Sequence, residues 1–373
     1  MCKNSHAGLA ARDLAMSAPH QQIRFCTSPD GSRVAYAVTG RGPPLVNAPR
    51  WLTHLEYDWQ SPLWRPWLAE LSRDRTLIRF DQRGNGLSDP NPPSFAFERW
   101  IEDLGAVVDA AGLARFDLFG ASQGGAAAVA YAARHPERVS RLILYGAYPR
   151  GQLRRDESPA AAEEAQALLQ IVRLGWGRDD PAFRHVFAMK FMPDGTGEHQ
   201  AAFDELARAC TTGENAVRLL EEFFRIDVRR EAEGVRCPTL VMHARHDSRV
   251  PHAEGLLFAS LVPGARFVTL ESRNHLLVET EPAWGAFCTE LRAFLAARDP
   301  GEPAAFAGLT ARETEVLELV ARGLDNAQIG ARLGLSEKTV RNNMTALFDK
   351  LEVENRAQAI VRAREAGYGR QPL

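Results

Sequence analysis

The sequence predicts a two-part chain, in which an α/β domain with an inserted helical cap is followed by a small all-α domain. From about residue 22 to 298, short β-rich runs alternate with helical runs, the pattern of a mainly parallel sheet covered by helices. Between Gly151 and Gly234 the strand signal disappears, and after residue 306 four short helical segments follow one another. The length of 373 residues also exceeds the usual size of a single core.

We expect eight strands in the α/β part, each a short apolar or β-branched run bounded by turn residues. They are Gln22–Cys26, Arg33–Val38, Pro44–Ala48, Thr76–Phe80, Asp117–Phe119, Arg141–Tyr145, Thr239–His243 and Arg266–Leu270. The cap is expected at about residues 151–234, with helical segments at Ala160–Arg173, Gln200–Ala209 and Ala216–Phe224.

The domain boundaries follow from composition. Residues 1–21 are expected to be a disordered segment, because they lack the apolar core of a signal peptide and any strong pattern. The α/β domain then spans residues 22–298, and two prolines and a glycine mark 299–305 as a linker before an all-α domain at 306–373. No apolar run reaches membrane-spanning length, so we expect a cytoplasmic protein that does not bind membranes.

The cysteines and the net charge limit which metal, cofactor and DNA interactions we expect. The five cysteines show no zinc or redox spacing, so we expect reduced thiols and neither a metal site nor a cofactor. The net charge is −2, and ten Lys/Arg against nine Asp/Glu from Phe306 onward give the all-α part almost no charge. Any DNA binding there must depend on local geometry, not on a basic tail.

A G-x-S-x-G motif at Gly120–Gly124 is the strongest chemical signal. The apolar run Phe116–Phe119 precedes it and the helical run Gly125–His135 follows, which predicts a strand, a sharp turn and a helix. Such a turn needs glycines because its backbone segments approach closely, and it lifts the Ser122 hydroxyl to the top of the sheet.

A serine hydroxyl becomes a nucleophile when a histidine removes its proton and a carboxylate orients that histidine. Asp247, just past a predicted strand, is the candidate acid, and His275, after the next strand, is the candidate base. His243 and His246 should point to opposite faces at a strand end, so we interpret both as structural and not as a metal pair.

These residues, with the D-x-R-G-x-G-x-S pattern at Asp81–Ser88, resemble the α/β-hydrolase family over roughly residues 22–298. The resemblance implies a triad of Ser122, Asp247 and His275, and an oxyanion hole built from the backbone NH of Gln123 and one NH of the loop after the third strand. Where the family carries His-Gly, this chain has Pro49 and Arg50, so the second donor would be the NH of Trp51.

Two interpretations of this half stay open. An intact triad beside an unusual oxyanion loop fits a slow or selective hydrolase, and it also fits a receptor that uses Ser122 as a polar ligand contact. Several aromatic residues near the entrance either line an apolar ligand site or belong to the core. They are Trp51, Tyr57, Trp59 and Trp64, with His54 as a polar neighbour.

The C-terminal part has clear helix boundaries. Thr310 and Glu313 form a capping box at the start of the first helix, and Gly323 ends that helix. The second helix covers Asn326–Leu333 and ends at Gly334, Ser336 caps the third, and the fourth runs from about Arg356 to Ala366 behind Asn355. In the third helix, Val340, Met344, Leu347 and Leu351 recur every three or four residues and should face the core.

The opposite face of the third helix carries Lys338, Thr339, Arg341, Asn342 and Thr345. A short helix, a tight turn and a polar-faced helix make a helix-turn-helix, whose second helix enters the major groove of DNA. Arginine pairs with guanine and asparagine with adenine, whereas lysine and threonine suit phosphates; for Arg341 a phosphate contact stays an alternative to base reading.

The stretch from about Phe306 to Gly367 resembles the LuxR-type (GerE-like) regulators through Leu309–Glu313, Gly323, Asn326, Ile329, Leu335–Val340, Lys350–Leu351 and Arg356–Ala357. Asn343 departs from it, since the family commonly has histidine there. The resemblance implies a homodimer on an inverted repeat in double-stranded DNA. Together the halves predict a transcription regulator whose hydrolase-like domain senses, and in one interpretation hydrolyses, a small ester, lactone or acyl ligand. The alternative is an active serine hydrolase with an appended regulatory domain.

Overall fold

The computed structural model describes residues 21–176, 178, 180, 182–297, 306, 308–366 and 368–369. Apart from Gln21, the predicted N-terminal segment at 1–21 lies outside the described residues, as does the predicted linker at 299–305. In the part of the chain that is described, no helix combines the length and the apolar character that a membrane crossing requires.

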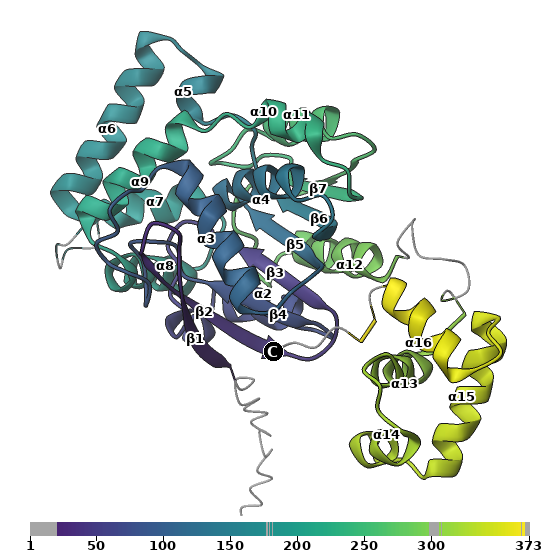
Figure 1. Ribbon diagram of the computed structural model, residues 1–373. Coiled ribbons are helices and arrows are strands. Elements are labelled where there is room, and N and C mark those ends of the chain that lie inside the picture. Colours follow the sequence, from purple (N-terminus) through teal and green to yellow (C-terminus); the bar gives the residue numbers. More distant parts are fainter. Residues whose placement is uncertain are drawn as a thin grey trace, which may run out of the picture.

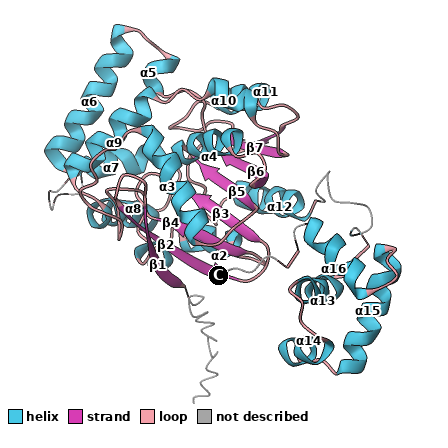
Figure 2. Ribbon diagram, viewed as in Figure 1, coloured by secondary structure: helices cyan, strands magenta, loops and turns pink. Residues whose placement is uncertain are grey.

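One eight-stranded sheet forms the centre of the larger domain (Figures 1 and 2). Its strand order is β1-β2-β4-β3-β5-β6-β7-β8; β1 and β2 are antiparallel to their neighbours, and all pairs from β4 to β8 are parallel. The strands are β1 (Gln22–Thr27), β2 (Arg33–Gly40), β3 (Pro44–Ala48), β4 (Thr76–Phe80), β5 (Phe116–Ala121), β6 (Val139–Tyr145), β7 (Thr239–Ala244) and β8 (Arg266–Leu270). All eight predicted strands are confirmed, with ends that differ by at most two residues.

The parallel strands of the centre are buried on both faces. Every residue of β5 and of β7 is buried, as expected for strands covered by helices on two sides. Two residues of β5 contact different helices. Phe116 packs on Tyr131 of α4 (Gln123–Arg134), and Phe119 packs on Trp67 of α2 (Arg65–Leu71). Because side chains alternate across a strand, α4 and α2 lie on opposite faces of the sheet.

The other helices that cover the sheet lie either on the face of α4 or on the face of α2. On the side of α4, that helix contacts α3 (Phe97–Ala110) and α10 (Arg229–Gly234), and α10 contacts α11 (His252–Leu261). On the side of α2, the Trp67 ring lies 4.7 Å from that of Phe287 in α12 (Pro282–Ala296). The short α1 (Tyr57–Gln60) precedes α2.

A helical cap connects β6 to β7, in the region that the sequence marked by its missing strand signal. Its helices are α5 (Gln152–Arg155), α6 (Pro159–Gly175), α7 (Ala182–Phe191), α8 (Gly197–Cys210) and α9 (Gly213–Arg225), and α10 follows them. The three predicted cap helices correspond to α6, α8 and α9, whose N-termini are capped by the hydroxyls of Ser158, Thr196 and Thr212. The sequence pattern did not indicate α5, α7 and α10.

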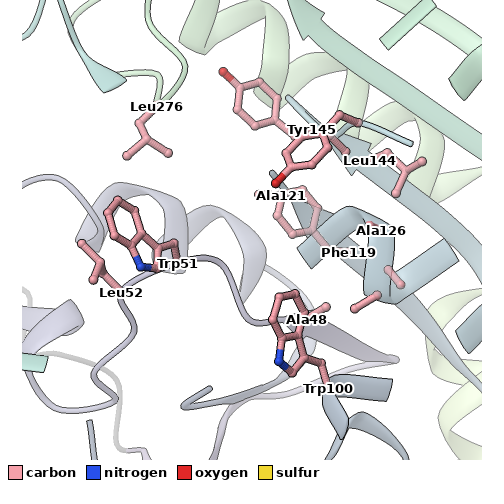
Figure 3. Close-up of a cluster of buried hydrophobic side chains, with 14 of the residues drawn as sticks. Ala48, Trp51, Leu52, Trp100, Phe119, Ala121, Ala126, Leu144, Tyr145 and Leu276 are labelled. Carbon is pink, nitrogen blue, oxygen red and sulfur yellow. The ribbon is translucent and has the colours of Figure 1, made fainter. Parts of the chain in front are cut away.

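Aromatic side chains link the cap to the sheet. Figure 3 shows part of this buried cluster, where Trp51 and Leu52 from the loop after β3 lie in one cluster with Phe119 and Tyr145 from the sheet. The Trp51 ring lies 5.3 Å from Phe187 and 5.9 Å from Phe191, both on α7. The cap is therefore packed onto the loop that was predicted to supply an oxyanion donor.

The C-terminal domain contains α13 (Ala311–Ala321), α14 (Asn326–Leu333), α15 (Glu337–Leu351) and α16 (Arg356–Glu365). The predicted capping box of Thr310 and Glu313 is formed, and Gly334 ends α14 with a φ of 65°, a conformation that glycine adopts readily. The apolar stripe of α15 is confirmed as core, because Val340, Leu347 and Leu351 are fully buried and Met344 nearly so.

Candidate active site and nucleic-acid interface

Ser122 lies in the sharp turn between β5 and α4. Its φ of 53° and ψ of −130° are strained for a non-glycine residue, and its NH donates to the Tyr145 carbonyl of β6 at 3.0 Å. A Cβ at Gly120 would lie 2.7 Å from the Gly125 Cα, and one at Gly124 would lie 2.5 Å from the Pro49 carbonyl oxygen. The glycines of the motif therefore let the strand, the helix and the β3 loop approach closely.

Asp247 and His275 lie in the loops after β7 and β8, at the same edge of the sheet as Ser122. The Asp247 Oδ2 and His275 Nδ1 are 2.7 Å apart, and both side chains are buried. The other carboxylate oxygen of Asp247 accepts the backbone NH groups of Arg249 at 2.8 Å and Val250 at 2.7 Å. The carboxylate is thus fixed, and it holds the imidazole by Nδ1.

The second ring nitrogen of His275, Nε2, is buried and has no hydrogen-bond partner within the described chain. A buried polar atom without a partner is unfavourable unless a substrate, a nucleophile or water engages it. The cap helps to hold the ring, because the backbone NH of His275 donates to the Phe191 carbonyl at 2.9 Å and the two rings lie 5.3 Å apart.

Electrostatics favour an ionised Asp247. Burial opposes its charge, but the charge and the hydrogen bond of His275 outweigh this effect, so the pKa of Asp247 is lowered. An ionised carboxylate at this place stabilises a protonated His275 during proton transfer.

His243 also contacts this carboxylate, which the sequence did not indicate. Its Nε2 lies 3.1 Å from the Val250 carbonyl oxygen and 3.5 Å from Asp247 Oδ2. Burial lowers the pKa of His243 in spite of the opposing charge of Asp247, which favours a neutral ring. His246 is exposed, so the two histidines face different surroundings, and the described residues hold no cluster of three or more metal-ligating side chains.

The two candidate oxyanion donors both border the space beside Ser122. The NH of Gln123 stands at the first position of α4, where helix NH groups have no partner within the helix, and Trp51 lies in the loop after β3. Neither NH takes part in a hydrogen bond among the residues described. Arg50 leaves this space free, because its guanidinium pairs with Asp58 at 2.8 Å and lies over the Trp64 ring.

A small cavity lies over Ser122. Its free space is about 20 Å³, which holds about one water molecule, so an organic ligand must displace side chains of the cap or the loops as it enters. The residues that line the cavity are Trp51, Ser122, Gln123, Tyr148, Gln152, Arg155, Phe191, Phe223, Phe224, Arg249 and Val250.

Only one of the aromatic residues near the predicted entrance lines this cavity. Trp51 does so, whereas Trp59 and Trp64 are buried in the core and Tyr57 and His54 do not border the cavity. Most of the aromatic lining comes instead from the cap, as Phe191, Phe223 and Phe224. The sequence could have marked α9 as a lining element, since its apolar residues recur at helical spacing, but it could not show which part of that face meets Ser122.

The five predicted DNA-binding residues share the exposed face of α15. Lys338, Thr339, Arg341, Asn342 and Thr345 are all exposed. The hydroxyl of Thr339 lies 2.8 Å from that of the N-cap residue Ser336, and the hydroxyl of Thr345 donates to the Arg341 carbonyl. Asn343 differs from the others, since it is half-buried and its amide donates to the Thr339 carbonyl at 2.8 Å.

Within the described part of the domain, the cationic side chains of this face are unpaired, whereas several other cations hold helices together. Lys350 pairs with Glu313 at 2.6 Å, Arg356 binds Asn326, and Arg364 binds the Ala321 carbonyl at 2.8 Å, so these three tie helices together. Lys338 and Arg341, by contrast, form no side-chain hydrogen bond or ion pair with any described residue. The arrangement leaves one strip of cationic and amide groups for an acidic partner.

Both halves correspond to known families, and the chain belongs to the family described as alpha/beta hydrolase fold, whose model matches residues 55–282. A second family, described as bacterial regulatory proteins of the luxR family, matches residues 307–363. The chain is therefore a fusion of an α/β-hydrolase domain and a LuxR-type DNA-binding domain, as the sequence motifs indicated.

Curated relatives match the hydrolase part. The chain is 27% identical over 275 residues to a pyrrolizixenacetamide deacetylase of Xenorhabdus hominickii, covering 72% of this chain and 96% of the relative. It is 26% identical over 259 residues to the non-heme chloroperoxidase CPO-A1 of Kitasatospora aureofaciens, covering 67% and 91%. Among solved structures, an enol-lactonase from Burkholderia xenovorans LB400 is 26% identical with a TM-score of 0.55, covering 74% of this chain and all of that chain. An esterase from Exiguobacterium antarcticum, at 23% identity and a TM-score of 0.63, shares the fold over 74% of this chain and all of that chain.

Proposed function

We propose that this protein is a transcription regulator whose α/β-hydrolase domain binds a small ester, lactone or other acyl ligand and thereby changes DNA binding by the LuxR-type domain. The observation that carries the proposal is the presence of both sites on one chain: a strained serine turn together with a histidine whose buried Nε2 has no partner among the described residues, and an exposed cationic face on α15. In this proposal the protein acts in the cytoplasm as a homodimer on an inverted repeat, the arrangement implied by resemblance to LuxR-type regulators.

The geometry also favours turnover of the ligand as a second function. Ser122 Oγ attacks the acyl carbon while His275 Nε2 accepts the hydroxyl proton, and Asp247 stabilises the imidazolium that forms. The carbonyl oxygen becomes an oxyanion that the NH groups of Gln123 and Trp51 stabilise. As the tetrahedral intermediate collapses, His275 returns the proton to the leaving alcohol, and water then releases the acid from Ser122 by the same steps. The support for this proposal is the 2.7 Å contact of Asp247 with His275.

A fluorophosphonate probe, which reacts covalently with activated serines, tests the acyl chemistry. We expect stoichiometric labelling of the native chain and none of Ser122→Ala, with labelling of His275→Ala slowed by orders of magnitude because the base is missing. Ser248→Ala is the matched control, since its hydroxyl donates to the Lys190 carbonyl outside the cavity. Absence of labelling in folded native protein would leave a receptor with an unreactive serine and contradict turnover.

A further inference from the structure

Among the described residues that line the cavity over Ser122, two carry a positive charge and none a negative one. Arg155, at the end of α5, and Arg249, in the loop after β7, both line it, and all its other lining residues are neutral. Burying a charge is unfavourable unless a hydrogen-bond or ionic partner compensates it, and the nearby aromatic rings contribute only a weak cation–π attraction. The charges here therefore require a partner that the described residues do not supply.

Arg155 is the more enclosed of the two. Its Nη1 is buried and has no hydrogen-bond partner among the described residues, and its guanidinium lies 5.6 Å from the centre of the Tyr148 ring. Burial lowers the pKa of Arg155, and the positive charge of Arg249 acts in the same direction. An arginine nevertheless stays protonated in proteins, so this site keeps its charge.

The side chain of Arg249 likewise has no partner among the described residues. Its guanidinium lies 6.0 Å from the centre of the Phe191 ring, and it forms no hydrogen bond or ion pair with the described part of the chain. The neighbouring Arg150 is different, because it engages both carboxylate oxygens of Glu254, at 2.7 Å and 3.4 Å. Glu254 is thereby hydrogen-bonded to Arg150 and not to the cavity arginines, although its negative charge still favours the protonated form of Arg155 by raising its pKa.

We propose that Arg155 and Arg249 form an anion subsite, so that the ligand carries a carboxylate in addition to the acyl group that faces Ser122. A guanidinium matches a carboxylate with two parallel hydrogen bonds, and the unpartnered Nη1 of Arg155 provides one of the donors. The ligand class is then a monoester, lactone or similar acyl derivative of a dicarboxylic acid. This inference rests on the proposed function in taking the same cavity as the ligand site.

Two matched esters test the subsite. In 4-nitrophenyl hydrogen adipate and 4-nitrophenyl hexanoate the acyl chains have the same length, and a carboxylate in the first replaces a methyl group in the second. We expect the native chain to prefer the adipate ester by about tenfold or more in kcat/KM, the scale of a charge-assisted hydrogen bond. Arg155→Gln and Arg249→Gln should each lower this preference by about tenfold. Arg154→Gln, an exposed neighbour outside the cavity, should leave it unchanged.

The preference is a ratio measured on one sample, so a partly unfolded variant lowers both rates and leaves the ratio intact. Equal kcat/KM for both esters, or a preference that neither arginine variant reduces, would overturn the subsite while leaving acyl chemistry supported. If the native chain hydrolyses neither ester, the acyl chemistry fails and calorimetry with adipamate and hexanamide tests the subsite by itself. Tighter binding of adipamate that depends on Arg155 supports it; equal binding of the two amides, or none, overturns it.

Discussion

At the scale of single residues, Asp247 determines what His275 can do. One carboxylate oxygen receives two backbone NH groups and the other holds the imidazole. This division fixes the ring tautomer, because the Nδ1 proton is held and Nε2 is left to accept a proton. Sequence position after two successive strands was the reason to predict both residues among many aspartates and ten histidines, and the fold places their side chains 2.7 Å apart.

Asp247→Asn should therefore lower kcat/KM for a 4-nitrophenyl ester by up to about 10⁴-fold, because the amide stabilises the wrong tautomer and no imidazolium. Steady-state hydrolysis measures the effect. Asp109→Asn, whose carboxylate is largely exposed and paired with Arg138, should retain the native rate. Equal rates for Asp247→Asn and the native chain would remove Asp247 from the proposed triad.

Asp81 links stability to pH. Its Oδ2 accepts the NH groups of Leu55 and Leu87, yet complete burial, with help from the charge of Asp58, raises its pKa to about 7. Between its unfolded pKa of about 3.9 and this value, the folded state binds more protons than the unfolded state. The contribution of Asp81 to folding stability therefore falls as pH rises through this window and is constant above it.

Asp81→Asn removes this dependence. We expect the thermal midpoint of the variant, relative to the native chain, to rise from pH 5 to pH 7 and then to level off. Differential scanning calorimetry at matched pH values gives the comparison, in which all unchanged groups cancel. A difference that stays constant over this range would show that Asp81 is ionised in the folded protein.

At the scale of elements, the turn from β5 into α4 depends on glycine at three positions. A Cβ at Gly124 would lie 2.5 Å from the Pro49 carbonyl oxygen, and a Cβ at Gly125 would lie closer still to the Ala147 Cβ. The motif predicted this element fully, since the composition of the turn and the runs on either side are local. The cap was predicted less well: α7 has only a weak apolar pattern, and its position depends on contacts with Trp51 and His275 that are distant in sequence.

Gly124→Ala should lower the free energy of unfolding by about 1–3 kcal/mol, because the new methyl group forces the β3 loop to move. Thermal denaturation measures it. Gly285→Ala is the matched control, since a Cβ there meets no atom within 4 Å and alanine in a helix is favoured by about 0.5–1 kcal/mol. Equal stability of both variants would contradict the close approach at Gly124.

The exposed face of α15 gives a second prediction about a single element. With a DNA sequence selected from a random duplex pool by the native chain, Arg341→Ala should weaken binding by about 1–3 kcal/mol and lose the preference for that sequence over random duplex. Lys338→Ala should weaken binding to all sequences alike and reduce the salt dependence. Fluorescence anisotropy over a salt series separates the two effects, and an unchanged preference in Arg341→Ala would assign that residue to the phosphates.

At the scale of the whole molecule, the motifs predicted both families and their order along the chain, because each has a local sequence signature. The lining of the cavity was not predictable in the same way. Arg155 and Phe223 come from cap helices and Arg249 from the loop after β7, and no spacing in the sequence shows that they meet above Ser122. The residues that would select a ligand therefore depend on tertiary contacts, whereas the two families can be identified from short sequence motifs.

Coupling between the two sites is the central claim for the whole chain, and fluorophosphonate modification of Ser122 tests it by occupying the cavity covalently. The measurement is the affinity of the full chain for its selected DNA before and after stoichiometric modification, with Ser122→Ala treated in the same way as the control. We predict a change of about 5- to 150-fold in the modified native chain, the usual range of allosteric coupling, and none in Ser122→Ala. Equal affinities before and after complete modification would contradict ligand sensing by the hydrolase domain.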